Sequence, residues 1–136
     1  MMIEVAAGVV FREGKVLITQ RRPDVHLGSL WEFPGGKREP GETFEQCLHR
    51  ELAEELGIEA EVGGLVESLT HHYPERSVQL KFFLCRWLRH EARPIDCLDL
   101  AWITREELCQ YEFPAADVRL LEKLRAHWPE WAAFEH

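Results

Sequence analysis

The sequence lacks the features that mark membrane proteins, zinc fingers and disulfide-rich scaffolds. None of its 136 residues belongs to an apolar run long enough to span a membrane, which takes about eighteen residues. No basic stretch precedes a long apolar segment near residue 1, so no secretory signal is expected. The 4 cysteines are widely spaced, without a C-x-x-C pair, which argues against a zinc site or a disulfide framework. We therefore expect a soluble, cytoplasmic protein with reduced, mostly buried thiols.

Basic residues are also scarce. The chain has 16 Lys and Arg against 24 Asp and Glu, a formal net charge of -8. Such a charge provides no long-range attraction to nucleic acid or to an anionic membrane surface, so neither is expected as a partner. A polyanionic small molecule would need metal ions to bind to such a chain.

The apolar content is sufficient for one domain with a core, which we expect to span residues 1–136. Hydrophobic residues make up 46% of the chain, and no linker, repeat or low-complexity tract interrupts it. Strands are expected, from their β-branched and aromatic content, at residues 3–11, 15–20, 59–73, 77–88 and 98–104. Gly14 is expected to close a hairpin between the first two. The segment 77–88 is almost continuously apolar, which is typical of a central strand.

One helix is predicted by its end signals. Thr43 and Gln46 have the spacing of a capping box, and Gly57 suits the left-handed residue that follows a last helical turn. A helix of about thirteen residues is expected between these signals.

Two further helices are predicted towards the end of the sequence. Thr104 and Glu107 predict the start of a short helix that continues to about Tyr111. Pro114 is expected to open a terminal helix, whose apolar face would consist of Val118, Leu121, Leu124 and Trp128. Strands, helix, strands and helix in this order predict a mixed α+β fold, with the main helix against a mixed sheet.

The stretch GGKREPGETFEQCLHRELAEELGI, Gly35 to Ile58, contains an unusual acidic cluster. Glu51, Glu54 and Glu55 are related by i,i+3 and i,i+4 spacing, so a helix places them on one side, where like charges repel. Taken alone, such a cluster is also typical of a solvated helix face.

The residues around this cluster fill a complete motif, G-x5-E-x7-R-E-U-x-E-E-x-G-U with U aliphatic, which is the Nudix box. Its specified positions are Gly36, Glu42, Arg50, Glu51, Leu52, Glu54, Glu55, Gly57 and Ile58. A match at every position arises by chance on the order of once in a billion placements. The chain therefore resembles the Nudix hydrolase superfamily, with the box at residues 36–58. The resemblance implies an α/β/α sandwich, in which a mixed sheet packs between helices.

The resemblance also implies metal-assisted hydrolysis of a nucleoside diphosphate linked to another group. Carboxylate oxygens suit hard divalent cations, so Mg2+ is the expected cofactor, with Mn2+ as an alternative. The expected metal ligands are the Gly35 carbonyl, Glu51, Glu54, Glu55 and Asp96. The expected catalytic residues are Glu51, as first choice of general base, with Glu54, Glu55 and Arg50.

Arg50 has two possible roles, which differ in the carboxylates that it would contact. A planar guanidinium can hold Glu42 or Glu51 and so orient the acidic cluster, a role that Lys would fill poorly. The alternative is an ordinary surface pair with Glu54 at i,i+4 spacing.

Segments outside the box resemble the MutT branch, whose members hydrolyse oxidised dGTP to the monophosphate and pyrophosphate. These segments are ITQRRPDVHLGSLWEFPGG, YPERSVQLKFFL and FPAAD. The positions that match that branch's nucleotide pocket are Arg21, the Phe33 backbone, Arg76 and Asp117. The chain departs from MutT at Asp117, where MutT has an amide, and at Asp96, where MutT has a Glu.

The nucleobase is left open between two alternatives. An ionised Asp117 can accept both N1-H and the 2-amino group of guanine, which favours 8-oxo-dGTP and a role in clearing oxidised nucleotides. Cytosine would require Asp117 to be protonated or to use a single oxygen. However, LWEF, GIEA and the PAD–LLE pattern of the last helix resemble pyrimidine (CTP) pyrophosphohydrolases.

A hypothesis of a different class is a nucleotide-sensing module that binds without cleaving. It is disfavoured because such modules commonly lose box carboxylates, and all of them are present in this chain. A monomer and a homodimer are both compatible with the sequence.

Overall fold

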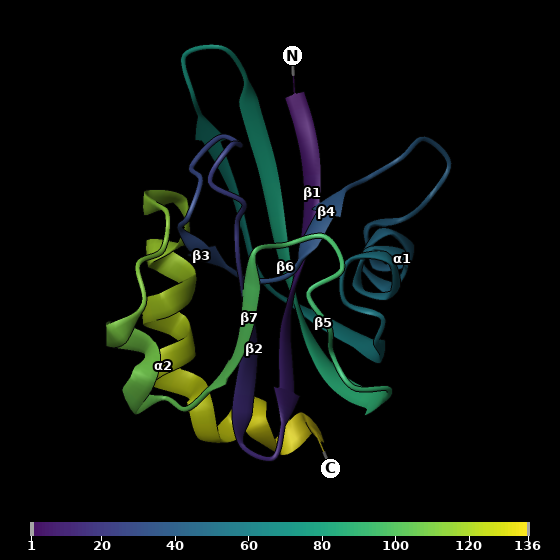
Figure 1. Cartoon of the computed structure of the whole chain (residues 1–136), viewed down its shortest axis with the longest axis vertical. Helices are drawn as coiled ribbons and strands as arrows, with labels where there is room; N and C mark the ends of the chain where they lie inside the picture. The colour runs from purple at the N-terminus through teal and green to yellow at the C-terminus, as the bar shows by residue number, and fades with distance from the viewer. Residues whose placement is uncertain (1, 136) are drawn as a thin grey trace.

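A mixed, seven-stranded sheet lies between two helices in the computed structural model, which describes residues 2–135 (Figure 1). Its strands are β1 (Met2–Arg12), β2 (Lys15–Gln20), β3 (Trp31–Glu32), β4 (Gly35–Lys37), β5 (Glu59–His72), β6 (Ser77–Arg89) and β7 (Asp99–Ile103). The α-helices are α1 (Phe44–Leu56) and α2 (Val118–Ala132). Short 3-10 helices are η1 (Glu106–Gln110), η2 (Ala115–Asp117) and η3 (Ala133–Glu135). The expected α+β class and the α/β/α sandwich are confirmed.

The sheet combines one parallel pair with antiparallel neighbours. Its main order is β3-β2-β1-β6-β5, with β4 pairing with β1 and β7 pairing with β2. β1 runs parallel to β6, whereas the hairpin of β5 and β6 is antiparallel. β6 therefore has a neighbour on each side, as its apolar sequence predicts. Glu13 (φ 53°) and Gly14 (φ 74°) form the predicted turn between β1 and β2.

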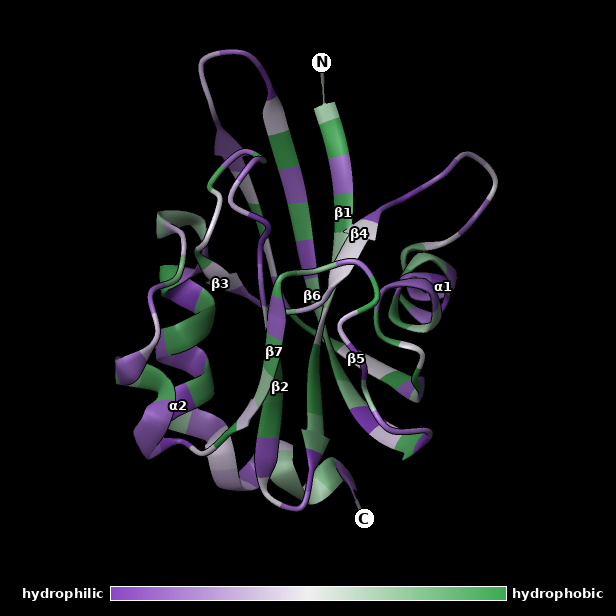
Figure 2. Cartoon of the chain, viewed as in Figure 1, coloured by the Kyte–Doolittle hydropathy of each residue, from purple (hydrophilic) through white to green (hydrophobic). Residues whose placement is uncertain are grey.

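The strands send alternate side chains into two cores, one on each face of the sheet. Along β1, Val9 and Phe11 pack on the α2 side, whereas Ala6 and Val10 pack on the α1 side. Figure 2 shows the apolar colour on these strands and on one side of each helix, and the hydrophilic colour in the exposed loops. Burial on both faces holds the two helices at fixed positions relative to the sheet.

The limits of α1 agree with the prediction. The Thr43 hydroxyl accepts a hydrogen bond from the Gln46 backbone at 3.0 Å, and the Gln46 side chain accepts one from the Thr43 backbone at 2.8 Å. Gly57 has φ 71°, and its N–H donates to the Ala53 carbonyl at 2.9 Å. The apolar face of α1 is buried through Leu48, Leu52 and Leu56. This burial directs the neighbouring acidic side of the helix towards β4.

The predicted apolar face of α2 was wrong at one residue. The buried residues of this helix are Leu120, Leu121, Leu124 and Trp128, whereas Val118 is 49% exposed. The η2 turn precedes the helix, so α2 begins only at Val118. The apolar stripe is centred near Leu120 and Leu121, which leaves Val118 at its margin.

The short helix predicted from Thr104 is a 3-10 helix, η1, and not an α-helix. The Glu107 carboxylate accepts from the Thr104 backbone at 2.8 Å, as in a capping box. In a full capping box the Thr104 hydroxyl would accept from the Glu107 backbone, but the Glu107 N–H donates to the Thr104 carbonyl at 3.1 Å instead. The 3-10 helix begins at Glu106, after an Arg105 that makes no side-chain cap.

Two expectations concern membranes and thiols. Across residues 2–135, each helix is too short or too polar to cross a bilayer. Cys47, Cys85 and Cys97 are buried, in agreement with expectation, and Cys109 is exposed.

Candidate active site

Two glycines bring the backbone of β4 against its neighbours. A Cβ atom at Gly35 would lie far closer than 3.0 Å to the Ala6 carbonyl of β1, the strand with which β4 pairs. A Cβ atom at Gly36 would lie closer than 3.0 Å to the Glu51 carboxylate. Because glycine has no Cβ, the acidic side of α1 can lie directly on this backbone. Both glycines thus allow a close approach that a side chain would prevent.

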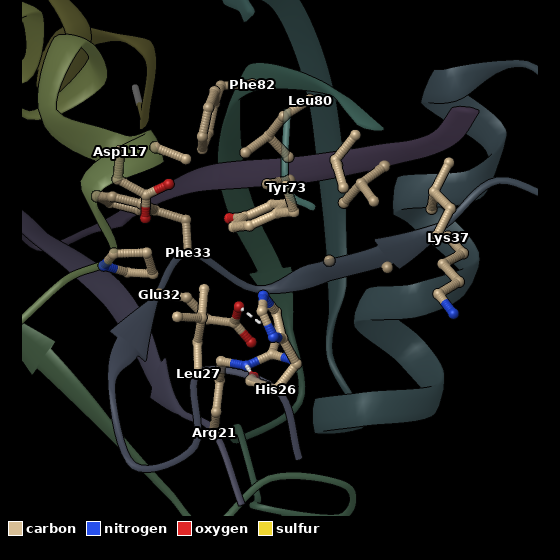
Figure 3. A pocket seen from close by; sticks show the side chains of 18 of the residues that line it. Arg21, His26, Leu27, Glu32, Phe33, Lys37, Tyr73, Leu80, Phe82 and Asp117 are labelled. Atoms are coloured by element: carbon tan, nitrogen blue, oxygen red, sulfur yellow. Dashed lines mark hydrogen bonds and ion pairs between the residues drawn. The ribbon is translucent and has the colours of Figure 1, made fainter. Parts of the chain in front are cut away.

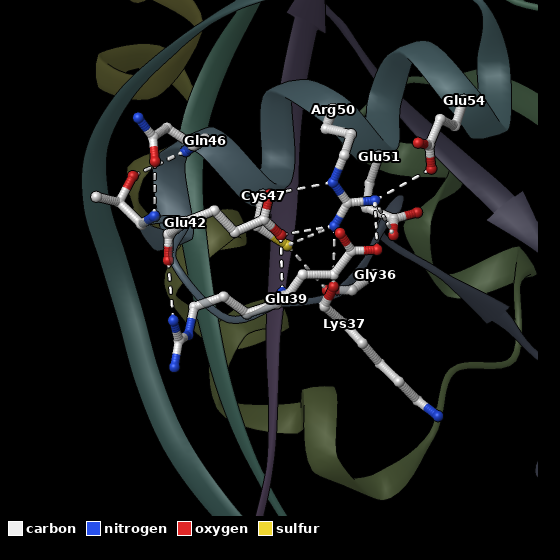
Figure 4. Close-up of polar contacts among 11 residues, drawn as sticks. Gly36, Lys37, Glu39, Glu42, Gln46, Cys47, Arg50, Glu51 and Glu54 are labelled. Carbon is white, nitrogen blue, oxygen red and sulfur yellow. Dashed lines mark hydrogen bonds and ion pairs between the residues drawn. The ribbon is translucent and has the colours of Figure 1, made fainter.

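Arg50 holds three carboxylates at once (Figure 4). Its Nη2 and Nε donate to the two oxygens of Glu42 at 2.6 and 3.1 Å, a bidentate pair. Its Nη1 donates to Glu51 at 3.0 Å and to Glu54 at 3.1 Å, and its Nη2 also donates to the Lys37 carbonyl at 3.1 Å. The orienting role and the surface pair considered for Arg50 therefore occur together.

The Arg50 contacts keep Glu42 ionised. Hydrogen bonds from Arg50, followed by one from the Glu39 backbone, lower the pKa of Glu42 to about 2. Glu42 remains a carboxylate at neutral pH, and it fixes the guanidinium that in turn orients Glu51 and Glu54.

Glu55 has a strongly perturbed environment. The residue is 9% exposed, and burial raises the pKa of Glu55 to about 8, with further contributions from the negative charges of Glu32, Glu51 and Asp96. A backbone hydrogen bond from Gly35 opposes this shift in part. Burial also raises the pKa of Glu51. Carboxylates with such shifts are typical of sites that handle protons or cations.

The donor set fits a hard divalent cation. Within residues 2–135, no three His, Cys, Asp or Glu side chains are grouped closely enough to hold a metal ion as they stand. Arg50 engages two of the expected ligands, Glu51 and Glu54. However, the negative charges that add to burial in raising the pKa of Glu55 would attract a cation placed nearby. Oxygen donors of this kind are the ligands that Mg2+ and Mn2+ prefer.

Asp96 lies beside Glu55, although its side chain has another contact. The Asp96 backbone N–H donates to the Glu55 carbonyl at 3.2 Å. The Asp96 carboxylate is 77% exposed and forms an ion pair with Arg22 at 3.4 Å. Asp96 and Glu55 line a cavity of about 190 Å³, together with Arg21, Arg22 and Glu32. Asp96 is therefore near the acidic cluster, and its carboxylate would have to leave Arg22 to bind a metal ion.

A larger cavity, of about 270 Å³, contains all four residues predicted to bind the nucleotide (Figure 3). Its lining includes Arg21, Phe33, Arg76 and Asp117. Asp117 and Lys37 are at opposite ends in Figure 3, and Gly35 and Gly36 also line the cavity. The cavity thus extends from Asp117 to the backbone that contacts the acidic side of α1.

Aromatic rings form one wall of this larger cavity. Phe33 is 3% exposed and stacks on Phe113, with ring centroids 5.5 Å apart and planes at 20°. Phe82 meets the Phe33 ring edge-on at 6.1 Å. The wall is therefore rigid and apolar, as suits a planar base.

Asp117 is a buried acid within the cavity. It is 4% exposed, and burial, followed by the negative charge of Glu32, raises the pKa of Asp117 to about 7, against a lowering by Arg21. Within residues 2–135 its carboxyl group makes no hydrogen bond to the protein. Because the pKa of Asp117 is about 7, both the ionised and the protonated form are populated near neutral pH.

The sequence prediction missed Glu32 and Tyr73. Glu32 lines both cavities and accepts from Arg21 at 2.9 Å, while the Arg21 Nε donates to the His26 carbonyl at 2.8 Å. The Tyr73 ring packs edge-on against His26 at 4.9 Å and lines the larger cavity. An acid within the apolar segment LWEF was an available signal for Glu32, whereas no local pattern marked Tyr73.

Comparisons with known proteins found similar sequences and similar folds. The family model of the NUDIX domain matches residues 6–123. A CTP pyrophosphohydrolase of Escherichia coli K12 is 41% identical over 125 residues, which cover 92% of this chain and 93% of the relative. An 8-oxo-dGTP diphosphatase of the same organism is 35% identical over 129 residues, with coverages of 90% and 96%. The solution structure of a MutT protein of the Nudix hydrolase family, from Staphylococcus aureus 252, has a TM-score of 0.77 at 29% identity, with coverages of 93% and 98%.

Proposed function

Because the chain belongs to the NUDIX domain family, whose hydrolases act on acid anhydrides, we propose that it cleaves a nucleoside triphosphate into the monophosphate and pyrophosphate. Enzymes of this family generally depend on a divalent metal ion, which we propose to be Mg2+ here. The proposed substrate is 8-oxo-dGTP, and the proposed role is to remove this mutagenic nucleotide from the pool.

One structural observation carries this proposal. The cavity that contains Asp117 and the cavity that contains Glu55 share Arg21 and Glu32 as lining residues. A nucleotide whose base lies near Asp117 can therefore direct its phosphates towards the acidic side of α1.

The acidic side of α1 provides the chemistry. Glu51, Glu54, Glu55, the Gly35 carbonyl and Asp96 would hold the cation. When bound, a divalent cation neutralises phosphate charge and promotes the activation of water. Glu51 is the proposed general base, which accepts a proton from the attacking water, a contribution of typically about 100- to 10,000-fold. Arg50 and the ionised Glu42 keep this carboxylate oriented.

The cavity residues provide the selectivity for a guanine-like base. An ionised Asp117 accepts from N1-H and the 2-amino group together. Phe33 lies against this position with its ring fixed by Phe113, and we propose that its backbone meets the oxidised edge of the purine. Arg21 and Arg76 are proposed to contact the rest of the nucleotide.

A second candidate substrate is CTP or a modified dCTP. The burial that raises the pKa of Asp117 to about 7 makes its protonated form accessible. A protonated Asp117 presents one donor and one acceptor, which complement N3 and the 4-amino group of cytosine. The 41% identity to a CTP pyrophosphohydrolase supports the same alternative.

A substrate panel tests the proposal. The panel consists of 8-oxo-dGTP, dGTP, CTP, 5-methyl-dCTP, ADP-ribose and dinucleoside polyphosphates, assayed with Mg2+ or Mn2+ and ranked by kcat/KM. We expect pyrophosphate release, with 8-oxo-dGTP ranked first. CTP or 5-methyl-dCTP in first place would select the second candidate, whereas a preference for ADP-ribose would contradict both. Binding without release of any product would support a nucleotide-sensing module.

A further inference from the structure

Glu67 is a buried acid that lies outside the candidate catalytic residues. It belongs to β5 and is paired with Phe82 of β6, a residue that lines the larger cavity. Its side chain is 4% exposed, and its Oε2 atom is buried without a hydrogen-bond partner. A buried carboxylate is costly unless it is compensated by charge, so its position requires an explanation.

Two cations of α2 compensate this charge. Arg119 Nε lies 3.5 Å and Lys123 Nζ lies 3.3 Å from the same Glu67 Oε2 atom. Lys123 also donates to the Val66 carbonyl of β5 at 3.4 Å. Arg119 and Lys123 are one helical turn apart, so both contacts together resist rotation and sliding of α2 along β5.

The helix that they fix begins beside Asp117. Aspartate is a preferred N-cap residue, yet the Asp117 carboxyl makes no cap to α2 and instead lines the cavity (Figure 3). The direction in which the Asp117 carboxyl points therefore depends on the position of the backbone of η2 and α2. Leu120 and Leu124 are fully buried and hold α2 against the sheet, and the two charged contacts add specific points of attachment to β5 near the start of the helix.

We propose that Glu67 is a positioning residue that sets nucleobase selectivity, by fixing the start of α2 and thereby the orientation of the Asp117 carboxyl. This inference rests on the proposed function, because it assigns the base to the Asp117 end of the cavity. Replacement of a buried ion pair is often tolerated by the fold, and a role in conformational specificity is one reason for its retention.

The test compares Glu67→Gln with a matched control, Glu61→Gln. Glu61 is also on β5 and pairs with an arginine of the adjacent strand, Arg86, at 2.6 Å; within residues 2–135 it makes no hydrogen bond or ion pair with α2. Arg119 and Lys123 are 68% and 43% exposed, so they can turn to water when Glu67 loses its charge. Glu67→Gln is therefore expected to fold.

The expected result is a change in selectivity and in KM. In Glu67→Gln the ratio of kcat/KM for 8-oxo-dGTP to that for CTP should move by about 10-fold towards the ratio of Asp117→Asn, mainly through KM. Glu61→Gln should keep the wild-type ratio. Thermal unfolding of both variants separates this effect from a general loss of stability.

A second set of variants tests the route through α2. The double variant Arg119→Met/Lys123→Met should show the same change of ratio, and adding Glu67→Gln to it should have no further effect. In the triple variant neither the buried charge nor its two cations remain, so its ratio, which should equal that of Glu67→Gln, keeps the test decisive if Glu67→Gln or the double variant does not fold. An unchanged ratio in Glu67→Gln or in the double variant, or additive effects, would overturn the positioning role. Absence of hydrolysis in the wild type and in Glu61→Gln would instead contradict the proposed function itself.

Discussion

The Gly36 backbone and the Glu51 carboxylate are in such close contact that no side chain fits between them. A Cβ atom at Gly36 would lie closer than 3.0 Å to all three atoms of that carboxylate. The neighbouring Gly35 faces backbone atoms of Ala6 and Ala7 instead, whereas a Cβ at Gly64 would meet nothing within 4 Å. Three glycines thus differ in what a methyl group would displace.

The first prediction uses this difference. Gly36→Ala should fold, because the flexible Glu51 side chain can move away, but kcat should fall by about 10- to 100-fold because the proposed base is displaced. Gly35→Ala should lose stability, since backbone cannot move as easily. Gly64→Ala is the control for both. Steady-state kinetics and thermal unfolding of the three variants provide the check; a fully active Gly36→Ala would argue against Glu51 as base.

The second prediction concerns the metal ligands. Glu54→Gln and Glu55→Gln should fold, yet each should lose Mg2+-dependent turnover on the order of 100-fold, because an amide lacks the charge that binds the cation. Glu45→Gln, in the first turn of α1, is the control on the same helix. Pyrophosphate release at saturating nucleotide, titrated with Mg2+, measures the effect. Near-normal rates in both variants would refute this assignment.

The third prediction concerns stability against pH in the metal-free protein. The pKa of Glu55 is about 8 in the folded state against an ordinary value of 4.5 for an exposed glutamate, so between these values the folded state binds more protons than the unfolded state. The contribution of Glu55 is therefore fully present below about pH 4.5 and is lost as pH rises to about 8.

Urea unfolding in EDTA, across this range, provides the measurement. The free energy of unfolding of the wild type should fall more steeply with rising pH than that of Glu55→Gln, in which this group cannot titrate. Mg2+ should reduce the difference, because a cation favours the ionised carboxylate. Parallel curves without the metal would show that Glu55 has no raised pKa.

The fourth prediction concerns the nucleobase. Since the pKa of Asp117 is about 7, the carboxylate dominates above this pH and the protonated acid below it. The ratio of kcat/KM for 8-oxo-dGTP to that for CTP should therefore rise as pH increases through about 7. Asp117→Asn should change this ratio and remove its pH dependence, apart from titration of the nucleotides themselves. A ratio that stays the same in Asp117→Asn would mean that Asp117 does not read the base.

Local patterns were sufficient for the elements that end in strong signals. Thr43, Gln46 and Gly57 determine the limits of α1 because each forms hydrogen bonds within a few residues of itself. The start of α2 was less predictable. Pro114 leads into a 3-10 turn, so α2 begins only at Val118, and Val118 is exposed. The spacing of apolar residues did not predict this turn, and it therefore placed Val118 on the buried face.

The sequence by itself determined the family and the chemistry. The Nudix box places Arg50, Glu51, Glu54 and Glu55 in one helix, and their i,i+3 and i,i+4 spacing puts them on one side of it. The tertiary structure decided which groups share an environment. Only the fold brings Glu32, which is half-buried, near the buried Asp117 and Glu55. Burial raises the pKa of all three groups, and the negative charge of Glu32 adds to the rise at Asp117 and Glu55. Burial and proximity depend on segments that are distant in the sequence, so no local pattern could specify them.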